Sequence, residues 1–141
     1  MDYPWAMVSL YHILGLNEYT INSSRPDHCN GGFDQFCDSG RKYSNISLIL
    51  VDAGRGDLLE YMSEYWKDFR GDDSNLWQHE WNKHGTCVST LEPDCYADYL
   101  PQQEVVDYFD KTVEVYKELP THEVSLILSV NDRLYIFRSK H

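Results

Sequence analysis

The chain has 141 residues, a formal net charge of −11 and an isoelectric point of about 4.8. Hydrophobic residues make up 42% of the sequence and aromatic residues 14%, which is enough to build the packed core of one domain. A chain this acidic repels phosphate over most of its surface. General nucleic-acid binding is therefore excluded, and any anionic partner needs a local positive site.

The N-terminal segment predicts no regular element. Residues 1–19 mix aromatic side chains with Gly15 and show no hydrophobic period. The start, MDYPWAMVSL, has Asp2 where a signal peptide has a basic region, and Ser9 interrupts its short apolar run. No apolar run in the sequence is long enough to span a membrane. We therefore expect that either the true start lies upstream or this copy is not exported.

A polar loop is predicted next. Residues 23–41, SSRPDHCNGGFDQFCDSGR, are rich in Gly, Pro, Asn, Asp and Ser, which indicates an ordered loop held by its cysteines. Residues 46–51 form a short apolar run of unassigned type. The glycosylation sequons Asn22-Ser23-Ser24 and Asn45-Ile46-Ser47 favour a secretory protein, although such triplets also occur often by chance.

Two helices are predicted in the middle of the chain. Residues 57–66 place apolar side chains on one face at helical spacing, with Asp57 as the N-cap after Gly56. Residues 75–85 form the second helix, and Gly85 is its expected C-terminal signal.

The clearest helix is predicted at residues 101–119. Pro101 lies near its start and Pro120 stops it. Its apolar stripe consists of Val105, Val106, Phe109, Val113 and Tyr116. The tail at residues 123–139 alternates in places around Asn131-Asp132, which predicts a β-hairpin.

The four cysteines fall into two equally spaced pairs, Cys29 with Cys37 and Cys87 with Cys95. An even count in a small aromatic-rich chain indicates disulfides in an oxidising compartment, and all three pairings remain open on spacing alone. A zinc site is disfavoured because neither pair is a C-x-x-C knuckle.

The segment LWQHEWNKHGTC, residues 76–87, carries the strongest chemical signal. At about 100° per residue, a helix makes His79 and Lys83 one i,i+4 pair and Glu80 and His84 another, so all four share a face about 140° wide. Such a face can accept a proton, donate one and hold a cation against developing negative charge. No metal site is predicted, because the zinc-peptidase pattern H-E-x-x-H is lengthened here to H-E-x-x-x-H. The alternative is an exposed helix with salt bridges.

The same segment resembles the second active-site segment of the ribonuclease T2 family. PDHCNGGFDQFCD, residues 26–38, resembles the segment that follows that family's first active-site histidine, and the likeness runs from about Thr20 to Thr121. The resemblance implies an α+β fold with an antiparallel sheet flanked by helices. The fold is expected to be incomplete, with divergent segments at residues 1–19 and 122–141, as in a truncated gene model or a degenerated paralogue.

The resemblance also implies a reaction. Single-stranded RNA is cleaved without metal or cofactor: a base removes the ribose 2′-OH proton, the oxygen attacks phosphorus, and an acid protonates the departing 5′-oxygen. A 2′,3′-cyclic phosphate remains. DNA is not a substrate because it lacks the 2′-OH. The implied location is extracellular or secretory, including vacuolar, while the sequence indicates neither base preference nor oligomeric state.

Site roles follow from the resemblance position by position. His84 resembles the general acid/base histidine of this segment and His79 the histidine that contacts phosphate. Glu80 and Lys83 resemble the pair that stabilises the pentacoordinate transition state. Each role fits its residue type, since lysine supplies a fixed charge and histidine titrates near neutral pH.

The first active-site segment departs from the family pattern. That segment resembles T-I-H-G-L-W-P-D, whereas the chain reads TINSSRPD, so the histidine is replaced by Asn22 and a tryptophan of the base pocket by Arg25. Asp27 is retained and is expected to contact a base. Phe33 is a candidate stacking ring, with ordinary loop packing as its alternative.

The resemblance implies a disulfide between Cys37 and Cys87. The family partners of Cys29 and Cys95 would lie in an N-terminal part that this chain lacks, so these two cysteines are either free or paired with each other. Three interpretations therefore stand. They are a T2-type endoribonuclease impaired by Asn22, a non-catalytic RNA-binding or secreted interaction protein, and an acidic domain without a ligand.

Overall fold

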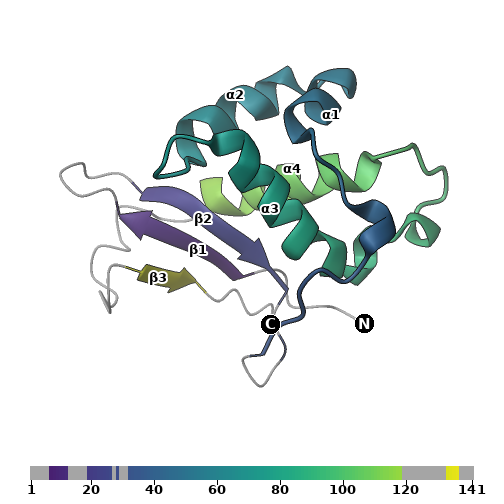
Figure 1. The fold of residues 1–141 in the computed structure, drawn as a ribbon, viewed down its shortest axis with the longest axis horizontal. Helices are drawn as coiled ribbons and strands as arrows, with labels where there is room; N and C mark the ends of the chain where they lie inside the picture. Colours follow the sequence, from purple (N-terminus) through teal and green to yellow (C-terminus); the bar gives the residue numbers. More distant parts are fainter. Residues whose placement is uncertain (1–6, 13–18, 27, 29–31, 119–132, 137–141) are drawn as a thin grey trace.

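The computed structural model describes residues 7–12, 19–26, 28, 32–118 and 133–136. Four α-helices lie within these ranges: α1 (Ile46–Asp52), α2 (Gly56–Tyr65), α3 (Asp73–Lys83) and α4 (Gln103–Lys117) (Figure 1). Short 3-10 turns connect them: η1 (Ser39–Arg41), η2 (Gly85–Cys87), η3 (Ser89–Leu91) and η4 (Pro93–Cys95). Among the described helices, none is long and apolar enough to cross a membrane.

Three strands form one antiparallel sheet in the order β2-β1-β3. The strands are β1 (Met7–His12), β2 (Tyr19–Arg25) and β3 (Arg133–Ile136). The β1–β2 register shifts between Ser9, which pairs with Ser23, and Leu10, which pairs with Ile21. Asn22 is therefore the extra residue of a bulge, which is where strands commonly bend or redirect a side chain.

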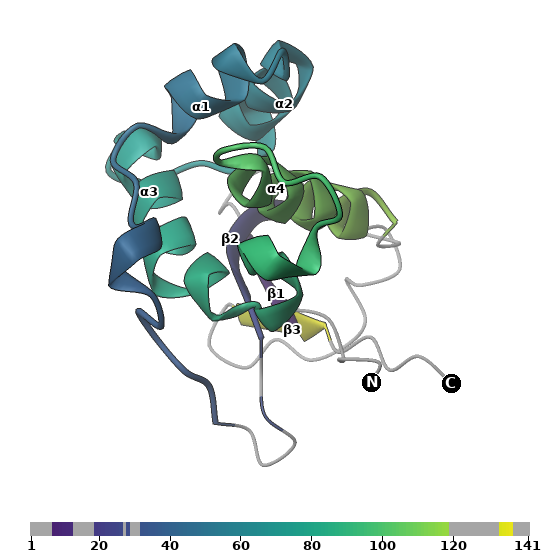
Figure 2. The same cartoon turned by 90° about the vertical axis from the view of Figure 1, so that its right-hand side faces the viewer.

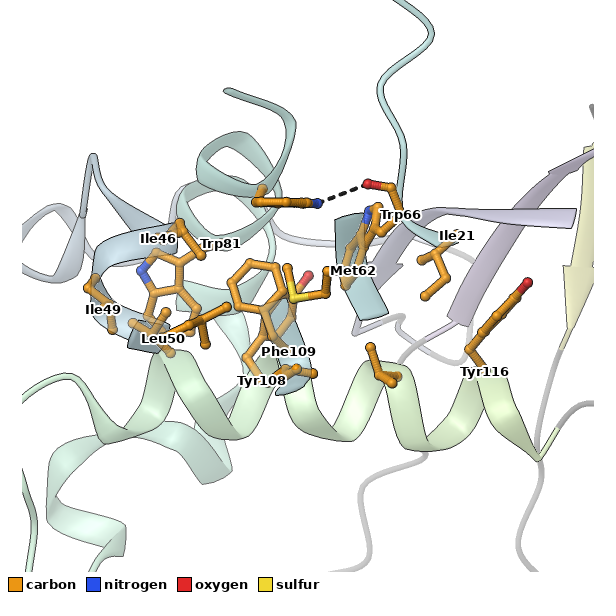
Figure 3. Close-up of a cluster of buried hydrophobic side chains, with 14 of the residues drawn as sticks. Ile21, Ile46, Ile49, Leu50, Met62, Trp66, Trp81, Tyr108, Phe109 and Tyr116 are labelled. Atoms are coloured by element: carbon orange, nitrogen blue, oxygen red, sulfur yellow. Dashed lines mark hydrogen bonds between the residues drawn. The ribbon is translucent and has the colours of Figure 1, made fainter. Parts of the chain in front are cut away.

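The helices lie on one side of the sheet, as the two cartoon views show (Figures 1 and 2). Helix α4 runs along one side of the core, and side chains from α1, α2, α3 and β2 pack against it (Figure 3). The most deeply buried apolar side chains are Ile21, Ile46, Leu50, Met62, Trp66, Trp81, Val105 and Phe109. Burial of these large apolar side chains stabilises the packing.

The N-cap of helix α2 differs from the predicted one. The helix begins at Gly56 with Arg55 at the N-cap position, and Arg55 makes no side-chain capping bond. Asp57, predicted as the N-cap, lies in the first turn instead. Because the helix has already begun at Gly56, Asp57 is inside it, and its carboxylate accepts a hydrogen bond from Nε of Arg55 at 3.1 Å.

Helix α3 ends before the predicted signal at Gly85. The last helical residue is Lys83, His84 is the C-cap, and Gly85 already belongs to η2. Gly85 lacks the positive φ of a C-terminal glycine cap. It is small for another reason, because a Cβ there would lie 2.3 Å from Cε3 of Trp81.

Other regions show elements that the pattern did not predict. The apolar run at 46–51 is helical, with Oδ1 of Asn45 accepting a hydrogen bond from the Leu48 amide at 3.4 Å. The start of the loop predicted at 23–41 belongs to β2, and β1 lies within 1–19. One half of the predicted hairpin is strand β3, which pairs with β1, while the other half lies outside the described residues.

Candidate active site on helix α3

Two tryptophans fix the rotation of α3. Nε1 of Trp77 donates to the carbonyl oxygen of Trp66 at 3.0 Å, and Nε1 of Trp81 donates to that of Arg41 at 2.7 Å. Both indoles are buried, so each donor is satisfied inside the core as buried polar groups require. These anchors hold one face of α3 inward and leave the face of His79 and Lys83 directed away from the core.

The loop at residues 32–38 is fastened to the end of α3. Cys37 forms a disulfide with Cys87, the pairing that the resemblance implied. The amide of Phe36 donates to the carbonyl oxygen of Lys83 at 2.9 Å, which joins the loop to the last helical residue. The loop therefore lies against the C-terminal part of the helix that carries the candidate residues.

His84 lies at this junction and is 3% exposed. Its ring centroid is 5.8 Å from that of Phe33, and the guanidinium carbon of Arg25 lies 3.8 Å from the Phe33 centroid on the ring face. Burial, and after it the nearby charges of Lys83, Arg25 and His79, together lower the pKa of His84 to about 4. Within the described part of the chain, Nδ1 of His84 is buried without a hydrogen-bond partner.

His79 occupies a different environment. It is exposed, and its ring meets the edge of Phe36 at a centroid distance of 6.2 Å. Its pKa is also lowered, first by partial desolvation and then by the charge of Lys83. Lys83 is thus within electrostatic reach of both histidines, and the structure brings these three side chains into one cluster.

Glu80 points inward from the same helix and is 4% exposed. Its Oε2 accepts a hydrogen bond from the amide of Ser24 at 3.3 Å, near the end of β2. The hydroxyl of Tyr108 on α4 donates to the carbonyl oxygen of Ser24 at 2.5 Å. The carboxylate therefore connects α3 to the strand that contains Asn22 and Arg25.

Two further residues belong to this region. Arg25 was noted in the sequence only as a departure from the family pattern, and its contact with Phe33 needs the fold of β2 beside the loop. Phe36 was not singled out at all, although the spacing FDQF places it three residues after Phe33. Asp27 lies outside the described residues. In the described ranges, no group of three or more His, Cys, Asp or Glu side chains could hold a metal ion.

Comparison with known proteins identifies the chain's relatives. Residues 9–129 match the Ribonuclease T2 family, a range wider at both ends than residues 20–121. A ribonuclease T2-like protein of Emericella nidulans is 76% identical over 106 residues, which cover 75% of this chain and 25% of that protein. Ribonuclease T2 of Aspergillus oryzae is 52% identical over 107 residues, covering 76% of this chain and 39% of that protein.

The fold has a matching relative among solved structures. The crystal structure of Actibind, a T2 ribonuclease, has a TM-score of 0.77 and 41% sequence identity, covering 82% of this chain and 52% of that one. The chain thus spans between a quarter and about half of the length of these relatives. From the family match and the identities, we conclude that this chain belongs to the ribonuclease T2 family.

Proposed function

We propose that the chain cleaves single-stranded RNA by 2′-OH transphosphorylation, with His79, Glu80, Lys83 and His84 as its catalytic residues and with turnover limited by Asn22. The observation that carries the proposal is the cluster of His79, Lys83 and His84 at the end of α3, beside the aromatic ring of Phe33. The charge of Lys83 gives an acidic protein a local positive site for phosphate. The fungal relatives named as ribonucleases support the same substrate class.

The lowered pKa of His84 suits the general base of this reaction. An imidazole with a pKa of about 4 is neutral in mildly acid and neutral solution, so it can accept a proton from the 2′-OH. The freed oxygen attacks phosphorus, the bond from phosphorus to the 5′-oxygen breaks, and a 2′,3′-cyclic phosphate forms. The charge of Lys83 and the ring of His79 stabilise the negative charge that develops on phosphorus.

Glu80 supports this arrangement from the inner side. Its hydrogen bond from the Ser24 amide holds the end of β2 against α3.

Protonation of the departing 5′-oxygen is the step of the proposed reaction that Asn22 impairs. Asn22 stands where the family has a second histidine, and an amide does not titrate in this range. Water must then donate that proton. Loss of one member of an acid–base pair lowers the rate on the order of a hundred- to ten-thousand-fold.

Binding of RNA without turnover is the second candidate function. It is favoured by Asn22 together with a histidine that stays neutral, because the site then retains its cations and rings but has one proton-transfer group. The disulfide between Cys37 and Cys87 favours an oxidising secretory compartment for either function.

The test is release of 2′,3′-cyclic phosphate from a homopolymeric RNA at mildly acid pH. We expect slow release by the parent chain, an increase with Asn22→His, and loss with His84→Ala. His28→Gln is the matched control, because His28 is an exposed histidine paired with Asp34 at 3.1 Å and has no assigned role. Equal release by the parent and by His84→Ala would contradict the site assignment. RNA binding without release, abolished by Lys83→Ala, would favour the second candidate.

A further inference from the structure

We propose that Phe36 and Lys42 form an additional nucleotide subsite beside His79. A base of single-stranded RNA stacks on the Phe36 ring, and the phosphate next to that base pairs with the Lys42 ammonium. The inference rests on the proposed function, since it specifies where a strand held at the α3 cluster continues.

The backbone of Phe36 is the first support. Its φ is 53°, a conformation that is strained for a bulky residue and persists only where the surroundings impose it. Two contacts impose it here, namely the hydrogen bond from the Phe36 amide to Lys83 and the disulfide at the adjacent Cys37. Gln102, the other described non-glycine residue with positive φ, has a polar side chain that loses nothing by exposure.

The exposure of the ring is the second support. Phe36 is 47% exposed, although a phenyl ring gains free energy when it is buried. The constrained backbone therefore holds an apolar ring in solvent next to a candidate phosphate-binding histidine. A base stacked on an aromatic side chain contributes about 1–3 kcal/mol to binding and covers such a surface.

The charges around the ring are the third support. Nζ of Lys42 lies over the Phe36 ring at 5.4 Å from its centroid, and the His79 ring is nearly perpendicular to it at a centroid distance of 6.2 Å. In a chain with a net charge of −11, a cation at this position attracts phosphate locally. A cation lies over each ring, but Phe33 is partly buried whereas Phe36 is exposed, so Phe36 is the more accessible stacking surface.

The subsite fits single-stranded RNA, because only unpaired bases can unstack from neighbouring bases and stack on aromatic side chains. The subsite accepts any base, since every base has an aromatic face. Duplex RNA, whose bases are stacked inside the helix, does not fit.

The experiment measures the affinity of the full chain for a labelled oligoadenylate, under conditions where cleavage is negligible. Phe36→Leu is expected to weaken binding by about 5- to 100-fold, and Phe36→Tyr to retain it. Lys42→Gln should reduce the slope of log affinity against log salt by about 0.7, the value for one phosphate of a single strand. Phe69→Leu is the matched control, because Phe69 is 87% exposed and also lies beside a cation, Arg70, at 5.0 Å.

The outcomes separate the two proposals. Binding that is weakened by Lys83→Ala but unchanged by Phe36→Leu would overturn the subsite and leave the proposed function standing. Equal weakening by Phe36→Leu and Phe69→Leu would also overturn it. No binding by the folded parent chain would overturn both proposals. Melting temperatures of all variants show whether each one is folded.

Discussion

The two histidines of the candidate site lie on one helix yet have opposite environments. His84 is buried against Phe33, whose face is covered by Arg25, whereas His79 is exposed against Phe36, whose face is met by Lys42. Each histidine thus contacts an aromatic ring, and a cationic side chain lies over that ring. In the proposed function, this difference in burial goes with different roles, proton transfer for His84 and contact with the phosphate for His79.

A single loop provides both aromatic rings. Phe33 and Phe36 lie three residues apart, and the disulfide at Cys37 fastens the loop to the chain just after α3. His84 is enclosed because the chain turns from α3 into η2 at that residue. His79 lies more than one turn earlier, on the open face of the helix.

Removing the disulfide should have the largest effect, because it loosens the loop that makes the two environments different. For a sequence separation of 50 residues, the loop-closure model gives a loss of about 4 kcal/mol in the free energy of unfolding when Cys37 and Cys87 are both replaced by serine. Urea denaturation measures this loss. Cys95→Ser is the control, because Cys95 is free and exposed. A double variant as stable as Cys95→Ser would show that the loop is held without the disulfide.

The pH dependence of stability compares the two histidines directly. The pKa of His84 is about 4 in the folded chain and about 6.5 when unfolded, so below pH 6.5 the unfolded state binds a proton that the folded state excludes. The free energy of unfolding therefore falls as the pH is lowered from 6.5 to 4, by roughly 2–3 kcal/mol from this residue. His84→Gln should remove most of that decrease in denaturant titrations at several pH values.

His79→Gln serves as the comparison in the same titrations. The pKa of His79 is lowered in the same direction, but the side chain is exposed, so its replacement should change the pH profile much less. The lowered pKa values of Asp38 and Asp57 act at more acid pH, below their ordinary value of 3.8. Equal flattening by the two glutamine variants would contradict the difference in burial.

Much of the helical structure could be predicted from the sequence, because an amphipathic period is a local property. The predicted helices at 57–66, 75–85 and 101–119 end within two residues of α2, α3 and α4. Helix α1 was not predicted, since a short apolar run does not distinguish helix from strand. Strand β1 was missed because its pairing with β2 and β3 joins distant parts of the chain.

The candidate site, like the helices, could be predicted only where it depends on local sequence. The motif predicted the candidate residues and the helix that carries them. The i,i+4 spacing placed all four side chains on one face, whereas in the structure Glu80 is buried and His79 is exposed. The burial of His84 was not predictable, because it depends on β2 and the loop, which come from elsewhere in the sequence. Phe36 was not singled out as a candidate residue, because a hydrophobic pattern does not show which residue adopts a positive φ.

The smallest expected effect comes from the N-terminal end of α3, remote from the buried histidine. Oδ1 of Asp72 accepts a hydrogen bond from the Asn75 amide at 3.1 Å, so Asp72→Ala should lower the free energy of unfolding by about 1 kcal/mol. Glu60→Ala is the control, an exposed acidic residue on α2 that removes the same charge without removing a cap. Fraying of the first turn leaves the packing of Phe33 on His84 intact. The variant should therefore lose stability equally at pH 5.5 and pH 7 in denaturant titrations, and a pH-dependent loss would mean that the two ends of the helix are coupled.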